Sequence, residues 1–164
     1  MISSLEIDKK QIDSYEKGRL FEEYVTKLFN DQHFKLKDWR KAERISFSEL
    51  PKNHCDPDLE LIFGRGQYKF AVECKWRNEF NDGILRWDKK DKSLETYRNY
   101  SRENNIPVFI VIGVGGDPSN PEKMFVTPLE KICSSVEIVE SDLMPYKRKP
   151  THKFFYDIRQ LKLF

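Results

Sequence analysis

Two short motifs in this chain place acidic and basic side chains in a pattern that can bind a cation. Asp58 follows Pro57, and further along the chain Glu73 and Lys75 flank a cysteine. Like charges on directly opposed residues of neighbouring strands repel each other and destabilise the pair. If Asp58 and Glu73 face each other, we expect a positive group between them: a divalent cation, the ammonium of Lys75, or both.

The alternation of apolar residues around these motifs predicts two antiparallel strands that bring the acids together. Residues 57–63 and 68–76 are each apolar at alternate positions, which is the period of a strand. A short glycine-containing turn joins them into a hairpin. In that register Asp58 lies directly opposite Glu73, and Lys75, two residues further on, points to the same face of the sheet.

Further patterns predict a mixed sheet flanked by helices. An amphipathic stripe predicts a helix over residues 12–30, and alternation predicts a strand over residues 33–40. Residues 92–104 form the next expected helix. The uninterrupted apolar run 107–112 indicates a strand buried on both faces, typical of a central parallel strand that follows a crossover helix. This order predicts an α/β fold, α+β in some schemes, with a mixed central sheet between helices.

Weaker patterns complete the expected fold. Residues 113–121 are rich in turn-forming types and predict a loop, followed by a brief strand at residues 124–126. Residues 127–130 have the form of a capping box with proline at the first helical position, which predicts a short helix. A last strand is expected at residues 154–158.

Length and composition indicate one folded domain, residues 1–164, with residues 1–10 as a loosely held lead-in. The 12 Phe, 7 Tyr and 3 Trp argue against disorder, and a net charge of +2 permits nucleic-acid binding without requiring it. The three cysteines are widely spaced and favour neither a zinc site nor a disulfide framework. Free thiols suggest a reducing cytosol, so we expect a cytoplasmic protein. No apolar run has the length of a signal peptide or a membrane span, so no membrane partner is expected.

Asp58, Glu73 and Lys75 in this order resemble the motif of the PD-(D/E)xK nuclease superfamily, whose restriction endonuclease-like core has the element order α-β-β-β-α-β. The helix motif that runs from Gly18 to Glu22 is similar to the G-x-x-F-E opening of type IV restriction endonucleases and archaeal Holliday-junction resolvases. The resemblance covers the bulk of the chain. It implies a metal-dependent nuclease that acts on DNA.

The resemblance also implies a role for each residue. Asp58 and Glu73 would bind one or two divalent metal ions, and the backbone carbonyl of Cys74 could complete the shell. Lys75 would assist the attacking water, and Glu22 would contribute through the metal or its water shell. Mg²⁺ or Mn²⁺ is the implied cofactor, since such hard cations prefer oxygen ligands. DNA is the implied partner, and a homodimer is common among resolvase-like relatives.

Basic and aromatic side chains near the third strand are candidates for contacts with DNA. Trp87, expected to be exposed, and Tyr97 would stack on bases. An ordinary charged surface explains the basic residues equally well, since acids are nearly as numerous. The glycines within residues 113–116 lack a phosphate-loop pattern, so no organic cofactor is expected. The candidate phosphate contacts are Arg77, Lys89, Lys90, Lys92 and Arg98.

Two other interpretations stay open. Many relatives carry a glutamine on the helix after the Glu-x-Lys strand, about one turn before a tyrosine, whereas residues 92–94 here read Lys-Ser-Leu. The chain could therefore be a catalytically inactive nuclease-fold module that binds nucleic acid or a partner protein. An isolated Glu-x-Lys is also common on the solvated face of a strand in so charged a chain, which leaves an unrelated α/β domain without a metal site.

Overall fold

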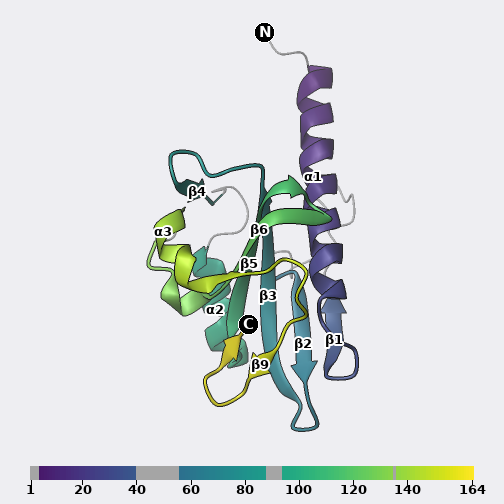
Figure 1. The fold of residues 1–164 in the computed structure, drawn as a ribbon, viewed down its shortest axis with the longest axis vertical. Helices are drawn as coiled ribbons and strands as arrows, with labels where there is room; N and C mark the ends of the chain where they lie inside the picture. Colours follow the sequence, from purple (N-terminus) through teal and green to yellow (C-terminus); the bar gives the residue numbers. More distant parts are fainter. Residues whose placement is uncertain (1–3, 40–55, 88–93, 135) are drawn as a thin grey trace.

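The computed structural model describes residues 4–39, 56–87, 94–134 and 136–164, with the side chains of the first helix described from Asp13 onward (Figure 1). The helices are α1 (Ser4–Lys27), α2 (Leu94–Asn104) and α3 (Glu140–Leu143), with 3-10 turns at Leu129–Lys131 and Met144–Tyr146. The strands are β1 (Phe34–Trp39), β2 (Leu59–Phe63), β3 (Tyr68–Arg77), β4 (Ile84–Arg86), β5 (Val108–Asp117), β6 (Asn120–Pro128), β7 (Glu137–Val139), β8 (Lys147–Arg148), β9 (Tyr156–Asp157) and β10 (Lys162–Leu163). No helix among these residues is long and apolar enough to cross a membrane.

Six strands form one mixed sheet in the order β1-β2-β3-β5-β6-β8. β3 and β5 run parallel, and the other neighbours run antiparallel. The chain leaves β3, passes through β4 and α2, and returns as β5, which is the crossover that the apolar run predicted. Residues 108–114 of β5 are all buried, which confirms a strand covered on both faces.

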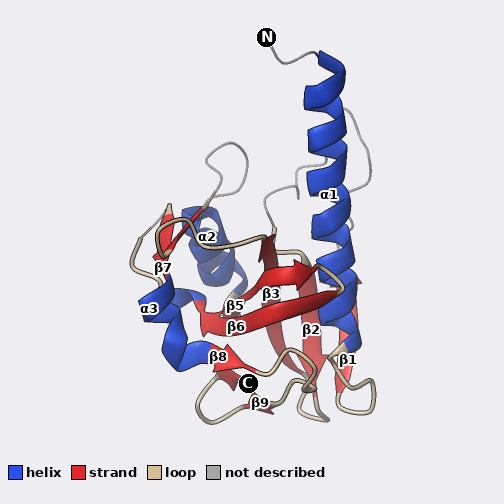
Figure 2. Ribbon diagram, turned by 45° about the horizontal axis from the view of Figure 1, so that its top comes forward, coloured by secondary structure: helices blue, strands red, loops and turns tan. Residues whose placement is uncertain are grey.

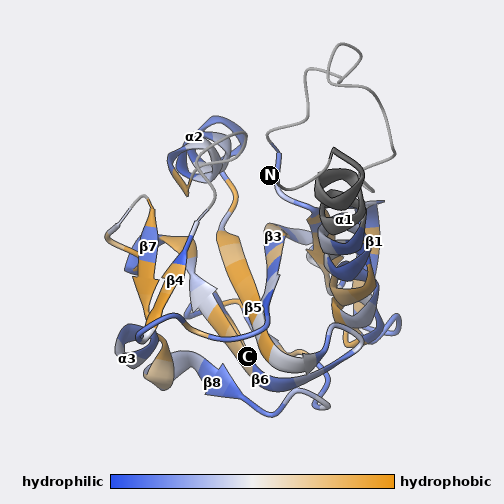
Figure 3. Cartoon of the chain, turned by 90° about the horizontal axis from the view of Figure 1, so that it is seen from above, coloured by the Kyte–Doolittle hydropathy of each residue, from blue (hydrophilic) through white to orange (hydrophobic). Residues whose placement is uncertain are grey.

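Helices cover both faces of the sheet, as Figure 2 shows, and seen from above α1 and α2 lie on opposite sides of the apolar β5 (Figure 3). Alternate residues of β3 face different layers, because side chains alternate along a strand. Phe70 and Val72 pack with Phe21 and Val25 of α1, whereas Ala71 belongs to the layer of α2. Residues of β3 that are two positions apart therefore share one layer.

α1 packs against β5 through a very close contact between Phe21 and Gly113. Phe21 is 0% exposed, and a Cβ atom added to Gly113 would lie 2.5 Å from Cε2 of its ring. The absence of a side chain at Gly113 therefore sets how closely this helix approaches the sheet.

Gly113→Ala is expected to lower the free energy of unfolding by about 1–3 kcal/mol, the usual cost of overpacking a well-filled core. Urea denaturation monitored by circular dichroism measures the loss. A Phe21→Leu substitution in the same protein should restore part of it, since Leu is smaller at the point of contact. A Gly113→Ala protein as stable as the wild type would contradict the prediction.

The expected loop at residues 113–121 is wrong, because these residues form the end of a long hairpin. β5 runs to Asp117, and β6 begins at Asn120, with which Asp117 pairs. Gly115 and Gly116 adopt φ values of +72° and +64°, which glycine reaches at little steric cost. The strand therefore changes direction without losing its partner, and the expected strand at residues 124–126 is the middle of β6.

Three other boundaries differ from expectation. Thr127 does not cap a helix: it is buried in β6 and its Oγ1 donates to the carbonyl of Pro128 at 3.3 Å, and only a 3-10 turn follows. The last strand at residues 154–158 shortens to β9, which pairs with β10. Residues 4–10, expected as a lead-in, belong to α1, whose N-terminal half projects beyond the sheet (Figure 1).

The C-terminal segment, residues 148–164, is hydrogen-bonded to the C-terminal end of α1 and the residue that follows it. The amide of Phe154 donates to the carbonyl of Leu28 at 2.9 Å, and the hydroxyl of Tyr24 donates to the carbonyl of Pro150 at 2.8 Å. Arg148 organises this segment, since its guanidinium lies 3.9 Å from the centroid of the Phe154 ring. Burial lowers the pKa of Arg148 to about 10, so the side chain is still a cation at neutral pH.

Arg148→Ala is expected to lower the free energy of unfolding by about 2 kcal/mol, because Nη1 donates to the carbonyl of Phe164 at 2.9 Å and Nη2 donates to that of His152. Thermal unfolding measures the change, with Arg159→Ala, at an exposed position, as the control. Equal losses in the two variants would show that Arg148 is an ordinary surface arginine.

Candidate active site

The hairpin of β2 and β3 has the predicted register. Leu59 pairs with Val72, so the preceding Asp58 lies opposite Glu73. Beyond this point β3 continues to Arg77 and, among the described strands, pairs with β5 alone. The sheet therefore opens beside the second half of β3, and side chains of both layers can reach the opening.

Asp58 and Glu73, here called the acidic pair, are held against each other by backbone amides. The amide of Asp58 donates to Oε2 of Glu73 at 3.3 Å, and the amide of Cys74 donates to Oδ2 of Asp58 at 2.9 Å. Each of the two acids is only 5% exposed. Two buried carboxylates this near to each other are costly unless a cation or a proton offsets their charge.

Lys75 lies on the same side of β3 as Glu73, as the period of two requires. Its Nζ lies 4.8 Å from the centroid of the Trp87 ring, which is a favourable cation–π distance. Lys75 also lines the same cavity as the acidic pair. The three groups of the predicted motif are therefore brought to one place.

Trp87 was expected to be exposed, and the structure shows the opposite. It is 3% exposed, and its ring meets Tyr97 edge to face, with the ring centroids 6.3 Å apart. Its amide donates to the carbonyl of Val136 at 2.7 Å, next to the pairing of β4 with β7. Tyr97 is 0% exposed, so neither ring is placed to stack on a base.

A cavity of about 480 Å³ connects the acidic pair with α1. Glu22 lines it from the helix, and Nε1 of Trp39 donates to Oε2 of Glu22 at 3.2 Å. The neighbouring Glu23 forms ion pairs with Arg19 and Lys27 along α1, at 3.6 and 3.1 Å. Glu22 is thus the carboxylate of this helix turn that faces the cavity, as the helical wheel indicates.

The oxygen atoms at the acidic pair are of the type that a hard divalent cation prefers. Mg²⁺ commonly takes one or two protein carboxylates and keeps several water ligands. Within the described residues, no three His, Cys, Asp or Glu side chains gather closely enough to hold a metal ion. A cation at this site would therefore rely on Asp58, Glu73, a backbone carbonyl and water.

The candidate DNA contacts fall into three groups. Arg77 lines the cavity, and its Nη1 donates to the carbonyl of Trp76 at 3.0 Å. Lys89, Lys90 and Lys92 lie outside the described residues. Arg98 lies elsewhere, at a second cavity.

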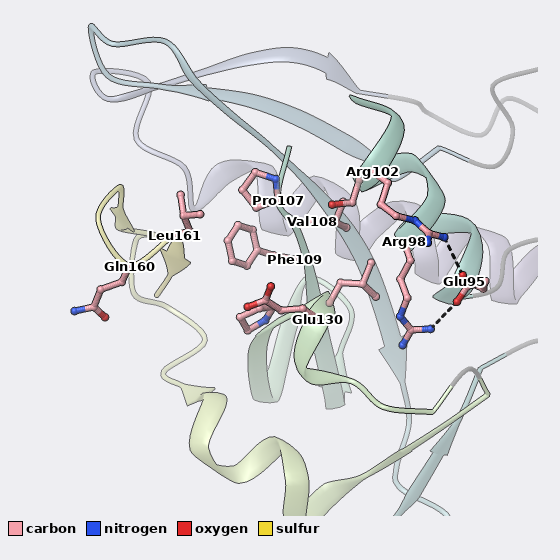
Figure 4. Close-up of a pocket in the computed structure, with 12 residues that line it drawn as sticks. Glu95, Arg98, Arg102, Pro107, Val108, Phe109, Glu130, Gln160 and Leu161 are labelled. Carbon is pink, nitrogen blue, oxygen red and sulfur yellow. Dashed lines mark hydrogen bonds and ion pairs between the residues drawn. The ribbon is translucent and has the colours of Figure 1, made fainter. Parts of the chain in front are cut away.

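The second cavity, of about 470 Å³, lies between α2 and the start of β5, with Val108 and Phe109 in its wall (Figure 4). Arg98 donates through Nη1 to Oε2 of Glu95 at 3.3 Å and through Nη2 to the carbonyls of Ile132 and Ser134. These contacts tie α2 to the segment after the 3-10 turn. The assignment of Arg98 to DNA binding stays a prediction that they do not support.

The cavity wall includes residues that the sequence analysis missed. Ser14 could have been found, because Ser14, Gly18 and Glu22 are spaced four residues apart and share one helix face. Trp76 could not, because its contact with the cavity depends on where β2 begins. The missed lining residues are Asp13, Ser14, Lys17, Trp76 and Asn78.

Comparison with solved structures finds the same fold in Hjc, a Holliday junction resolvase from the archaeal hyperthermophile Archaeoglobus fulgidus. The TM-score is 0.52 at 17% sequence identity, over 81% of this chain and 91% of that chain. No protein-family model matches the chain, and no curated protein matches it. The likeness confirms the expected fold class, a restriction endonuclease-like core with a mixed central sheet flanked by helices.

Proposed function

We propose that this chain is a nuclease that hydrolyses phosphodiester bonds of DNA with the help of Mg²⁺ or Mn²⁺. The acidic pair carries the proposal: two carboxylates, each 5% exposed, meet at a cavity that Lys75 also lines. Acids forced together in a cleft are typical of functional sites, where a cation offsets their charge. The fold shared with a Holliday junction resolvase supports the same class of chemistry.

Asp58 and Glu73 would hold the metal ion, with the backbone carbonyl of Cys74 as a further ligand. The amide hydrogen bonds described above hold each carboxylate by one oxygen and so fix its orientation. A bound divalent cation supplies Lewis acidity at the phosphate and makes water more acidic. Glu22, whose Oε2 is oriented by Trp39, would position water on the helix side of the cavity.

Lys75 would stabilise the charge that grows on the phosphate oxygens and orient the attacking water. Water loses a proton to the solvent as its oxygen bonds to phosphorus, the bond to the leaving sugar oxygen breaks, and that oxygen takes up a proton from the solvent. The aromatic face of Trp87 holds the ammonium of Lys75 in place without neutralising it. A preorganised charge of this kind lowers the barrier because it needs no rearrangement during the reaction.

Arg77, at the edge of the cavity, is the best placed of the proposed phosphate contacts. Lys89, Lys90, Lys92 and Arg98 complete the proposed set. Contacts of this type make affinity fall steeply with salt concentration. The homodimer and the cytoplasmic location stay predictions.

Metal dependence is the direct test. We expect the purified protein to cleave plasmid or single-stranded DNA with Mn²⁺ or Mg²⁺ and to be inactive in EDTA. Mn²⁺ should also raise the melting temperature, since a ligand that binds only the folded state stabilises it. No cleavage together with an unaltered melting temperature would overturn the proposal.

The inactive module that the sequence left open makes a different prediction. It would bind DNA in a salt-dependent way without turnover, and Asp58→Ala would leave that binding unchanged. Metal-dependent cleavage that disappears in Asp58→Ala would exclude it.

A further inference from the structure

Gly18 lies in the interior of α1, and the described residues around it give no reason for a glycine there. Glycine weakens a helix interior relative to alanine. Its φ is not positive, and no described atom lies within 4 Å of a Cβ built at this position. Gly113 differs, because its missing side chain makes room for Phe21. A glycine that the described residues do not require, at an open position, is consistent with the close approach of a ligand.

The space beside Gly18 is continuous with the acidic pair. Gly18 lines the cavity of about 480 Å³ that contains Asp58 and Glu73, and also an adjoining cavity of about 150 Å³. The two cavities share Ser14, Gly18 and Glu22. Together they form a hollow along one face of the helix, here called the α1 groove, which opens onto the acidic pair.

The wall opposite α1 contains a buried donor without an acceptor. Nε1 of Trp76 is inaccessible to solvent and has no hydrogen-bond partner in the described part of the chain. Nζ of Lys17 lies 5.8 Å from the centroid of the Trp76 ring and pairs with Asp13 at 2.7 Å. Buried polar groups are nearly always satisfied, so an unmet N–H in a cavity that two cations, Lys17 and Arg77, also line matches an anionic oxygen.

We propose that the α1 groove receives the sugar-phosphate backbone of one nucleic-acid strand and that Gly18 is the positioning residue that keeps it open. The phosphate next to the one being cleaved would replace Asp13 as the ion-pair partner of Lys17. This movement of Lys17 uncovers the Trp76 ring, whose N–H then donates to a phosphate oxygen. The proposal rests on the proposed function, since it places the strand relative to Asp58 and Glu73.

Filling the groove tests the proposal. Gly18→Ala and Gly18→Leu should both raise the melting temperature, by about 2–4 °C for the alanine, because a better helix former replaces glycine. In a non-cleaving Glu73→Gln background, Gly18→Leu should weaken binding of a short fluorescein-labelled DNA strand at least tenfold, measured by anisotropy. With active protein, Gly18→Leu should raise KM more than it lowers kcat. Asn99→Leu is the control, because it places the same leucine side chain at an exposed position of α2, far from the groove in sequence.

The donor is tested separately by Trp76→Phe, which keeps an aromatic ring but removes the N–H. We expect about tenfold weaker binding of the labelled strand, the usual scale for one hydrogen bond to a charged group. A stabilised Gly18→Leu protein that binds the strand as well as the wild type would contradict the proposal that the α1 groove receives the strand. A wild type that does not bind the strand would contradict it as well. A wild type that binds the strand but neither cleaves it nor responds to Mn²⁺ would contradict the proposed nuclease activity and would leave the proposal of strand binding in the α1 groove intact.

Discussion

Replacing Glu73 by Gln should abolish metal-dependent cleavage while leaving the fold in place. The amide keeps an oxygen that can accept from the amide of Asp58, so the backbone contact survives. What disappears is the negative charge of a direct metal ligand. The loss of activity should therefore exceed the roughly 10–100-fold typical of changing a residue that only supports a ligand.

Two further measurements show that the loss is electrostatic. The melting temperature of Glu73→Gln in EDTA should equal or exceed that of the wild type, because one of two facing buried charges is removed. The rise in melting temperature with Mn²⁺ should be lost. Glu79→Gln, at an exposed position just after β3, is the matched control and should behave as the wild type. Full cleavage by Glu73→Gln would refute the assigned role.

Phe21→Ala should lower the free energy of unfolding by about 3–5 kcal/mol, the usual cost of emptying a fully buried aromatic site. The ring is 0% exposed and fills the space above Gly113, which has no side chain of its own to occupy the gap. Since Glu22 is the next residue, removal of the Phe21 ring should also make the position of the Glu22 carboxylate less well defined.

Urea denaturation followed by circular dichroism measures this effect. Phe155→Ala is the control, because the same residue type is 60% exposed there. We expect the control to lose less than about 1 kcal/mol, since an exposed side chain loses little buried surface. Similar decreases in the free energy of unfolding at both positions would show that Phe21 makes no special contribution to the packing between α1 and the sheet.

The hairpin of the acidic pair was predictable because local rules determine it. Apolar alternation assigns the faces of β2 and β3, and a short turn leaves few registers, so Leu59 had to meet Val72 and Asp58 had to meet Glu73. The crossover to β5 followed from a run too apolar for any half-exposed strand. The place of Glu22 at the cavity came instead from resemblance and the helical wheel.

Features that depend on distant partners were missed. Trp87 precedes a run of charged residues and looks exposed in sequence, but it is covered because β4 pairs with β7, some fifty residues away. The glycines at residues 113–116 suggested a loop, whereas Gly115 and Gly116 let β5 turn while it keeps β6 as its partner. The half of β3 that lacks β2 as a neighbour, and so opens the cavity, depends on where β2 begins, which alternation fixes only within a few residues.

The tryptophans of this chain are arranged so that the protein carries its own optical reporter. There are three, and each adjoins the site: Trp39 bonds to Glu22, Trp76 lines the cavity and Trp87 lies under the ammonium of Lys75. Intrinsic indole fluorescence therefore originates from this region alone. Binding of a cation or a nucleic-acid strand can be followed by emission from the unlabelled protein. Single Trp→Phe variants separate the signals of the three tryptophans.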